Sequence, residues 1–318
     1  MPKVSVVVPV YGVEPYIGRC LESLFGQTLD DIEYLFVDDA TPDESVSKIY
    51  EALERYPHRK PRTKVLRHEV NRGLAAARTT GLRAATGTYV ISCDPDDYVE
   101  RDIYEKLYTR AVETDADIVA CHFWVEDGQK NRMAYTYSDT PQQCLKEMCK
   151  IGCTYLTVWD KLVRRALIVR HGIYPYEGSD YGEDLNCVVR YFYYARTIQV
   201  VGEPLYHYCP RADSISGAPQ KRETFEKRMK NVDRICEFLH GQSGTTYESF
   251  CNRMKFSLKR EYRPLFEGDE AAWFRLYRES HRDILSYTAY PFKSRLVLWL
   301  AYRNLPMYRL MKRIFWGV

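Results

Sequence analysis

Three acidic clusters in this chain have spacings that suit chemistry on a phosphorylated substrate. The first, Asp94-Pro95-Asp96-Asp97, places three carboxylates within four residues. Like charges this close are unfavourable unless a cation neutralises them, and Mg²⁺ or Mn²⁺ is typically held by one or two carboxylates together with substrate phosphates. The spacing therefore indicates a metal site that could bridge a diphosphate. A solvated acidic turn before a helix N-terminus is the alternative.

Two shorter clusters add a nucleotide contact and a base. In Asp38-Asp39, a carboxylate could accept hydrogen bonds from a nucleobase or ribose, or could cap the next helix. In Gly182-Glu183-Asp184, Asp184 could take a proton from an acceptor hydroxyl, which typically contributes about 10²–10⁴ in rate. A simple helix N-cap is the alternative for Asp184.

The elements that must position these clusters alternate between strand and helix in the first half of the chain. Short apolar runs typical of buried strands lie at residues 4–8, 34–37, 64–66, 89–92 and 117–121. Helical patterns begin near residues 17 and 42 and cover 74–86 and 103–113. This alternation predicts an α/β fold with a doubly wound, mostly parallel, Rossmann-like sheet. Such sheets bind ligands beyond the carboxyl ends of their strands, where the first two acidic clusters would share one rim.

Cap residues set the expected ends of two helices. Thr41 suits an N-cap, with Pro42 at the first helical position and Glu44 completing a capping box. Gly87 suits the C-terminal cap of the alanine-rich helix. Residues 126–181 show no regular pattern, a helix is expected at 184–195 and a strand at 198–201, and from about residue 222 only helices are expected.

Composition limits the classes of function. The 318 residues are 45% hydrophobic and carry a net charge of only +3, which argues against a nucleic-acid partner. The ten cysteines show no CxxC spacing, and the N-terminus opens into a strand-like run and not a signal peptide. We therefore expect reduced thiols and a cytoplasmic location. No apolar run reaches the roughly 18 residues needed to span a bilayer.

In its order of motifs, the chain resembles family 2 glycosyltransferases with the GT-A fold, over residues 1 to about 217. The matching segments are Val4–Tyr11, Glu14, 20–24 with Gln27, Val37-Asp38-Asp39 with Asp43 and Ser45, Asn71 with Gly73, Ala77, Arg78 and Gly81, Asp94–Asp97, and Gly182–Asp184. The chain departs from the pattern at Gly12, at Ala40-Thr41-Pro42 and at Thr79. The resemblance implies a nucleotide-sugar-binding catalytic domain at 1–217 and a helical C-terminal region at 218–318.

The resemblance also implies roles for individual residues. Asp184 would be the base of an inverting, single-displacement transfer, and Asp96 the principal ligand of Mn²⁺ or Mg²⁺. Arg78 would contact the pyrophosphate or brace the sheet rim. The full donor-binding set would be Pro9, Tyr11, Glu14, Asp39, Arg78, Asp94 and Arg211.

Two further segments, near residues 207–216 and 159–161, supply candidate metal, donor and acceptor contacts, and structural alternatives are open for them. His207 could be a third metal ligand, or a purely structural histidine, and Arg211, Ser214 and Ser216 belong to the same late segment. An acceptor contact is expected at Trp159, Lys161 and Glu183. The alternative is a buried tryptophan beside a surface lysine.

The expected function is transfer of a sugar from a nucleotide-diphosphate-sugar, with a UDP-sugar as the expected donor, to a saccharide or lipid-linked acceptor in surface polysaccharide or glycolipid synthesis. One alternative is a nucleotidyltransferase that makes a nucleotide-sugar, although residues 9–14 hold one glycine where such enzymes place a glycine-rich loop. A nicotinamide dehydrogenase would need G-x-G-x-x-G there. The other alternative is a non-catalytic, membrane-associated scaffold.

Residues 291–318 combine six lysines and arginines with large apolar side chains and contain no acidic residue. A basic amphipathic helix of this kind can lie in an anionic membrane interface. We therefore expect peripheral contact with the inner face of the cytoplasmic membrane, with packing of the tail on the main domain as the alternative. The sequence leaves the oligomeric state open.

Overall fold

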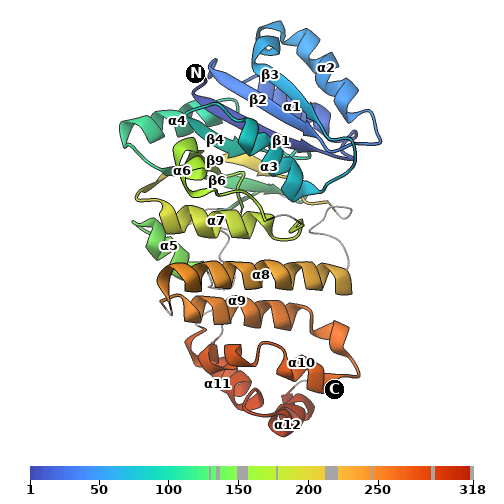
Figure 1. Cartoon of the computed structure of the whole chain (residues 1–318), viewed down its shortest axis with the longest axis vertical. Helices are drawn as coiled ribbons and strands as arrows, with labels where there is room; N and C mark the ends of the chain where they lie inside the picture. Colours follow the sequence, from blue (N-terminus) through green and yellow to red (C-terminus); the bar gives the residue numbers. More distant parts are fainter. Residues whose placement is uncertain are drawn as a thin grey trace. The chain divides into compact units, whose positions relative to one another are not determined.

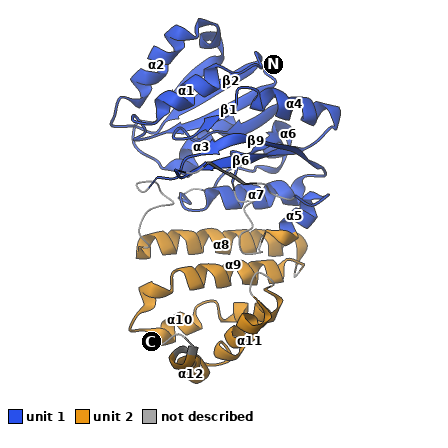
Figure 2. Cartoon of the chain, turned by 180° about the vertical axis from the view of Figure 1, so that it is seen from behind, with its two compact units in different colours: residues 1–145, 155–218 blue, residues 146–154, 219–318 orange. Residues whose placement is uncertain are grey.

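The computed structural model describes residues 1–128, 130–133, 137–148, 157–176, 178–211, 221–244, 246–287 and 291–315 (Figure 1). The chain divides into two compact units, one of residues 1–145 and 155–218 and one of residues 146–154 and 219–318 (Figure 2). The boundary expected at 217/218 lies outside the described residues.

The first unit is built on one sheet with the strand order β3-β2-β1-β4-β8-β6-β9-β5, and β7 pairs with β6. The strands are β1 (Val4–Val10), β2 (Ile32–Asp38), β3 (Thr63–Arg67), β4 (Tyr89–Ser92), β5 (Tyr98–Val99), β6 (Ile118–Glu126), β7 (Lys130–Met133), β8 (Lys161–Arg164) and β9 (Ile198–Tyr208). The helices are α1 (Ile17–Phe25), α2 (Ser45–Arg55), α3 (Leu74–Ala84), α4 (Ile103–Glu113), α5 (Pro141–Glu147), α6 (Arg165–His171) and α7 (Glu183–Tyr194), with a 3₁₀ turn at Pro57–Arg62.

Strands β3, β2, β1 and β4 form the parallel part of the sheet. Every residue of β1 and β2 is buried, as expected for parallel strands covered on both faces. Helix α3 packs closely on β1, because a Cβ on Gly81 would lie 2.3 Å from Cγ1 of Val7. The α/β fold expected from the sequence is confirmed, and the expected strands at 4–8, 34–37, 64–66, 89–92 and 117–121 correspond to β1–β4 and β6.

The other part of the sheet is mixed, which the sequence did not indicate. Strand β8 runs antiparallel to both β4 and β6, with Val163 opposite Val90 and Ile118. It lies in the stretch 126–181 that was expected to be irregular, as do β7, α5 and α6. A strand of four residues is too short to show a period in sequence, so pairing with its neighbours decides its conformation.

Three expected helix ends are wrong. Helix α2 begins at Ser45, because the Thr41 hydroxyl bonds Asp43 and the Gly12 N–H and does not cap a helix. Helix α3 ends at Ala84, and Gly87 is needed because a Cβ there would lie 2.8 Å from the Ser5 nitrogen. Helix α7 begins at Glu183, so Asp184 lies within its first turn and is not the cap.

The second unit is helical, as expected after residue 222. It contains α8 (Arg222–Ser243), α9 (Glu248–Glu261), α10 (Glu270–Arg275), α11 (Phe292–Ala301) and α12 (Leu305–Phe315), with 3₁₀ segments at Arg263–Phe266 and Arg278–Ser286. No helix among the described residues has both the length and the apolar content to cross a membrane.

The C-terminal tail forms part of the core of this second unit. Tyr302, Tyr308 and Met311 are buried in a cluster with Trp273 and Phe256. The tail is therefore two helices, α11 and α12, that help to hold the unit together, and not one amphipathic helix added to it.

Candidate active site

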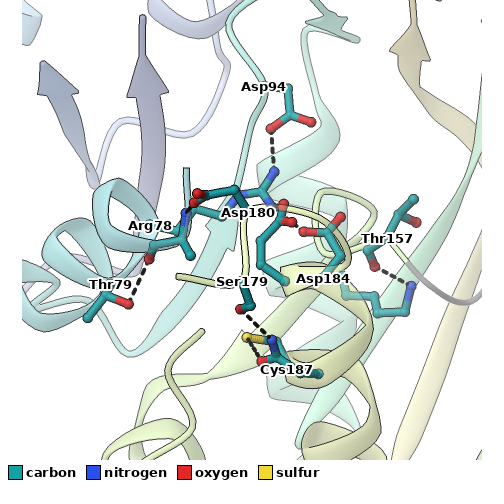
Figure 3. Close-up of polar contacts among 12 residues, drawn as sticks. Arg78, Thr79, Asp94, Thr157, Ser179, Asp180, Asp184 and Cys187 are labelled. Atoms are coloured by element: carbon teal, nitrogen blue, oxygen red, sulfur yellow. Dashed lines mark hydrogen bonds and ion pairs between the residues drawn. The ribbon is translucent and has the colours of Figure 1, made fainter. Parts of the chain in front are cut away.

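Arg78 joins two of the acidic clusters. It lies on α3 with 3% of its surface exposed, and its guanidinium pairs with Asp94 at 2.7 Å, with Glu183 at 2.5 Å and with Asp184 (Figure 3). Asp94 follows β4, whereas Glu183 and Asp184 form the first turn of α7. Burial would lower the pKa of Arg78, but the charges of Asp184, Asp94 and Glu183 raise it well above its ordinary value. The guanidinium therefore stays charged.

One guanidinium faces three carboxylates, so the cluster keeps an excess of negative charge. Burial raises the pKa of Asp184, and the nearby charge of Arg78 opposes that rise. Burial, and then the charge of Asp184, raises the pKa of Glu183 well above its ordinary value. The Asp184 side chain remains 20% exposed, whereas Glu183 is 8% exposed. Of these two, Asp184 is the carboxylate that a substrate hydroxyl can reach.

The start of α7 depends on a loop that also contacts α3. Gly182 precedes the helix with φ of +87°, a backbone conformation that favours glycine. Two residues earlier, Asp180 accepts a hydrogen bond from the Ala75 N–H at 3.1 Å, at the N-terminus of α3. Gly73 must be glycine here, because its φ is +88° and a Cβ would lie 2.4 Å from Asp180. Asp180 was missed from sequence, because nothing in the irregular stretch marks its contact with α3.

The Asp94–Asp97 segment is held from β9. The Tyr206 hydroxyl accepts a hydrogen bond from the Asp94 N–H at 3.1 Å and donates one to Asp97 at 2.7 Å. Asp97 also accepts from the Cys209 N–H at 2.8 Å and is 1% exposed. Burial, and then the charges of Asp94 and Asp96, raises the pKa of Asp97 well above its ordinary value. Asp97 therefore supports the loop from inside and does not face a ligand.

Asp96, like Asp94, is partly open, at 18% side-chain exposure against 25% for Asp94. Arg211 contacts one oxygen of Asp96 through Nε and Nη2, both at 2.8 Å, and its guanidinium lies 4.2 Å from the centre of the Tyr16 ring. Burial raises the pKa of Asp96, and the charge of Asp94 adds to this. Arg211 therefore lies beside the acidic segment, and its expected contact with the donor stays a prediction. Ser214 and Ser216 lie outside the described residues.

The Asp38-Asp39 cluster lies at the end of β2, which pairs with β1 on the side opposite β4. Asp39 is 3% exposed, and its carboxylate accepts hydrogen bonds from the N–H groups of Arg72 and Gly73 and bonds His68 at 2.6 Å. These contacts link the end of β2 to the start of α3. Asp39 therefore braces the rim, and its expected contact with the nucleotide stays a prediction.

The remaining expected donor residues lie along β1 and the loop after it. Pro9 is buried in β1 opposite Val37, whereas Tyr11 is 50% exposed. Glu14 accepts a hydrogen bond from the Glu44 N–H at 3.2 Å, and its own N–H donates to Asp43 at 2.9 Å. These two bonds join the loop to the start of α2, so Glu14 has a structural role beside its expected one.

Asp43 strengthens the same junction. Burial would raise its pKa, but hydrogen bonds from Ser45, Glu14 and Thr41 outweigh it and lower the pKa of Asp43 to about 2. Asp43 is therefore ionised at every physiological pH.

The structure corrects the expected acceptor contacts. Trp159 is 4% exposed, and its ring is stacked 4.2 Å from Tyr206 and 6.0 Å from Tyr208, so it is not open to a sugar face. Lys161 is fully buried and bonds Asp160, so it is not a surface lysine. Glu183 is paired with Arg78. All three side chains are enclosed within the packed unit and are not exposed to an acceptor. Local sequence does not reveal this burial.

His207 is also reassigned. Both ring nitrogens are engaged, Nδ1 with Glu126 at 2.7 Å and Nε2 with Glu100 at 2.9 Å, and the ring stacks on Tyr98 at 4.0 Å. The side chain is 3% exposed. This arrangement gives His207 a structural role in place of the expected metal ligation.

The acidic rim still fits a divalent cation that a substrate brings with it. Among the described residues no group of three or more His, Cys, Asp or Glu side chains is arranged to hold a metal. Mg²⁺ and Mn²⁺ do not require such a cage when phosphates supply other ligands. Asp94 and Asp96 are partly open, and the charge of Asp94 makes Asp96 harder to ionise, which a cation between them would relieve. The donor set thus fits a cation held by two carboxylates plus phosphates.

Comparison with known proteins identifies the family. The profile of Glycosyl transferase family 2 matches residues 5–170, which is more than half of the chain. The uncharacterized glycosyltransferase EpsJ of Bacillus subtilis (strain 168) is 34% identical over 261 residues, covering 78% of this chain and 73% of EpsJ. The minor teichoic acid biosynthesis protein GgaB of the same organism is 33% identical over 129 residues, covering 39% of this chain and 14% of GgaB.

A solved structure supports the fold. The crystal structure of S. aureus TarS residues 1–349 in complex with UDP-GlcNAc aligns with a TM-score of 0.63 at 20% identity, covering 95% of this chain and 91% of that chain. At this identity the likeness concerns the fold alone. The family match and EpsJ carry the assignment, which favours glycosyl transfer over nucleotidyl transfer and over a scaffold. The chain belongs to glycosyl transferase family 2 and is a glycosyltransferase.

Proposed function

We propose that this chain is an inverting glycosyltransferase that moves a sugar from a UDP-sugar to a saccharide or lipid-linked acceptor hydroxyl. The observation that carries the proposal is the Arg78 cluster, which brings the carboxylate after β4 and the carboxylate of α7 onto one guanidinium. A donor site and a base must lie this close for a direct displacement. TarS, solved with UDP-GlcNAc, supports a UDP-sugar as the donor to test first.

The proposed reaction has a single step. Asp184 accepts the proton of the acceptor hydroxyl as the hydroxyl oxygen forms a bond to the anomeric carbon of the donor. The bond from that carbon to the diphosphate oxygen breaks on the opposite face, so the configuration inverts and the nucleoside diphosphate leaves with the electron pair. Arg78 holds Asp184 in place, and its charge opposes the rise in the pKa of Asp184 that burial causes.

Asp94 and Asp96 are the residues that would hold Mn²⁺ or Mg²⁺ with the donor. A bound cation would neutralise charge on the leaving diphosphate, an effect worth several kcal/mol. Arg211, paired with Asp96, supplies a second cation on the same side of the site. Tyr206 keeps the loop that carries both aspartates attached to β9.

Donor binding can be measured before the acceptor is known. We expect UDP-GlcNAc or another UDP-sugar to raise the melting temperature more with Mn²⁺ than without it, because binding to the native state stabilises it. Asp96→Asn should remove most of the Mn²⁺-dependent part of the shift. The matched control is Asp102→Asn, on a carboxylate that is 40% exposed and pairs with Lys106. Equal shifts for Asp96→Asn and the unmodified protein would refute the metal assignment.

We also propose that the second unit contacts an anionic membrane through α11 and α12, on the inner face of the cytoplasmic membrane. Both helices expose large apolar side chains at i,i+4 spacing, Phe292 with Leu296 and Leu310 with Ile314, at 40–65% exposure. Lys293 on α11, Arg309 and Arg313 on α12, and Arg303 between the two helices are exposed. A membrane site would suit an acceptor in surface polysaccharide or glycolipid synthesis, and the teichoic acid relative GgaB supports that setting.

Point substitutions test the membrane contact better than truncation, because Tyr302 and Tyr308 are core residues. We expect the protein to sediment with vesicles of phosphatidylglycerol and phosphatidylcholine, less at high salt, and hardly at all with phosphatidylcholine alone. Phe292→Glu with Leu310→Glu should release it. Val169→Glu, at an equally exposed apolar position of the first unit, is the control. Undiminished sedimentation of the double variant would contradict the proposal.

A further inference from the structure

Asp160 and Lys161 form a fully buried ion pair that the proposed reaction does not use. Both side chains are 0% exposed, and Nζ of Lys161 lies 2.7 Å from Oδ1 of Asp160. A buried charge pair is costly to desolvate, and replacing such a pair with apolar residues is often neutral or stabilising. The pair is therefore better explained by a requirement for a fixed backbone conformation at this position than by a gain in stability.

The pair closes the turn of residues 157–161, which precedes β8. Lys161 also donates to the Thr157 carbonyl oxygen at 2.7 Å, and Asp160 accepts from the hydroxyls of Thr157 and Tyr137, each at 2.9 Å. The Cys121 N–H donates to the Asp160 carbonyl oxygen at 3.0 Å, which attaches the turn to β6. Each carboxylate oxygen of Asp160 thus has a partner, and the turn is held from several directions.

The two residues at the centre of this turn face the two halves of the active site. The backbone of Val158 faces the carboxylate of Asp184 closely enough to oppose the rise in the pKa of Asp184. Trp159 stacks on Tyr206, whose hydroxyl holds the Asp94 N–H and Asp97. Figure 3 shows Thr157 beside Asp184, on the side away from Asp94. The turn therefore connects the proposed base with the segment proposed to hold the donor.

We propose that the Asp160–Lys161 pair is a positioning element for the transfer reaction, which holds the 157–161 turn so that the backbone of Val158 fixes and orients Asp184. The inference rests on the proposed role of Asp184 as the base. A hydrogen bond to the carboxylate favours its ionised form, so loss of the Val158 contact would both misplace the base and make it harder to ionise. Misplacement of a reacting group by about 1 Å can cost about 10²-fold in rate.

The test uses the double variant Asp160→Asn with Lys161→Met, which removes both charges together. UDP release from UDP-GlcNAc with water as acceptor should fall about 10- to 100-fold. The Kd of UDP with Mn²⁺ should change less than about threefold, because the donor carboxylates remain. Lys106→Met, which removes a lysine from a surface ion pair, is the control and should change neither value. An unchanged rate, or equal losses in rate and affinity, would overturn the inference.

A second arm separates positioning from general damage. In an Asp184→Asn background the double variant should cause no further loss of rate, because residues that act through one another are not additive. A further loss of the same size would show that the pair does not act through Asp184. If Asp184→Asn alone leaves the rate unchanged, the proposed base is wrong, whatever the pair does.

A milder variant covers the case in which the double variant does not fold. Thr157→Val with Tyr137→Phe removes both hydroxyl donors to Asp160 but keeps the charge pair. It should show a smaller fall in rate, again with unchanged affinity for UDP. A rate equal to that of the unmodified protein would count against the proposal.

Discussion

Replacing Asp184 with asparagine is expected to slow donor cleavage by about 10²- to 10⁴-fold and to leave donor affinity unchanged. Asparagine keeps the size of the side chain but cannot take the proton of the attacking hydroxyl. The rate is measured as UDP release from UDP-GlcNAc, and affinity as the Kd of UDP with Mn²⁺ by calorimetry. A loss that is confined to turnover marks a group that acts in the transition state.

The matched control is Asp115→Asn, because Asp115 also pairs with an arginine but is 82% exposed. Asp115→Asn should leave both rate and affinity intact. Turnover within a few fold of the unmodified protein for Asp184→Asn would move the base elsewhere.

The same experiment has a pH signature. Burial raises the pKa of Asp184, and the base works only when ionised, so turnover should fall as pH decreases through a pKa above the ordinary range of a carboxyl group. Asp184→Asn should remove this acidic limb from the residual rate. Donor binding should show a different pH dependence, because it depends on Asp94, Asp96 and the phosphates.

Arg78→Met is expected to have the largest effect on the fold as well as on activity. It leaves Asp94, Glu183 and Asp184 crowded together without their cation. Removal of one partner of a buried ion pair typically costs about 3–5 kcal/mol in the free energy of unfolding. Urea titration followed by circular dichroism measures this loss, and donor cleavage should be undetectable.

The pH dependence of the stability of Arg78→Met follows from the carboxylates that Arg78 contacts. Without Arg78 the folded-state pKa values of Glu183 and Asp184, which burial already raises, should rise further above their unfolded values. The protonated carboxyl groups then stabilise the folded state relative to the unfolded chain at low pH. This stabilisation is lost as pH rises through their folded-state pKa. The stability deficit should therefore be larger at about pH 8 than at about pH 5. Arg83→Met, on the same helix and beyond the cluster, is the control; a deficit that does not vary with pH would contradict the electrostatic explanation.

Much of the site was visible in the sequence because its signals are local. The run at residues 4–8 is typical of a strand buried on both faces, and acidic residues directly after such strands are expected at the carboxyl edge of a parallel sheet. Gly73 and Gly81 were matched to the family motif, and the structure supplies the reasons for them, a positive φ at Gly73 and the close approach of α3 to β1 at Gly81.

The errors came where burial decides a residue's role. Trp159, Lys161 and His207 have side chains that could bind sugar, phosphate or metal, and only their surroundings show that they are enclosed. Asp180 is the opposite kind of error, a residue of the site that the sequence did not predict. Its contact with the N-terminus of α3 depends on a loop without periodic pattern.

The sequence by itself determined the parallel strands, the acidic clusters at their ends and the helical nature of the chain after residue 222, because each is a property of neighbouring residues. Only the tertiary structure decided that Arg78 joins Asp94 to Asp184, that β8 enters the sheet antiparallel, and that Asp160 and Lys161 are buried behind the base. These features arise from contacts between segments far apart in the chain. Their energies depend on burial and on the charges brought together, which no local pattern contains.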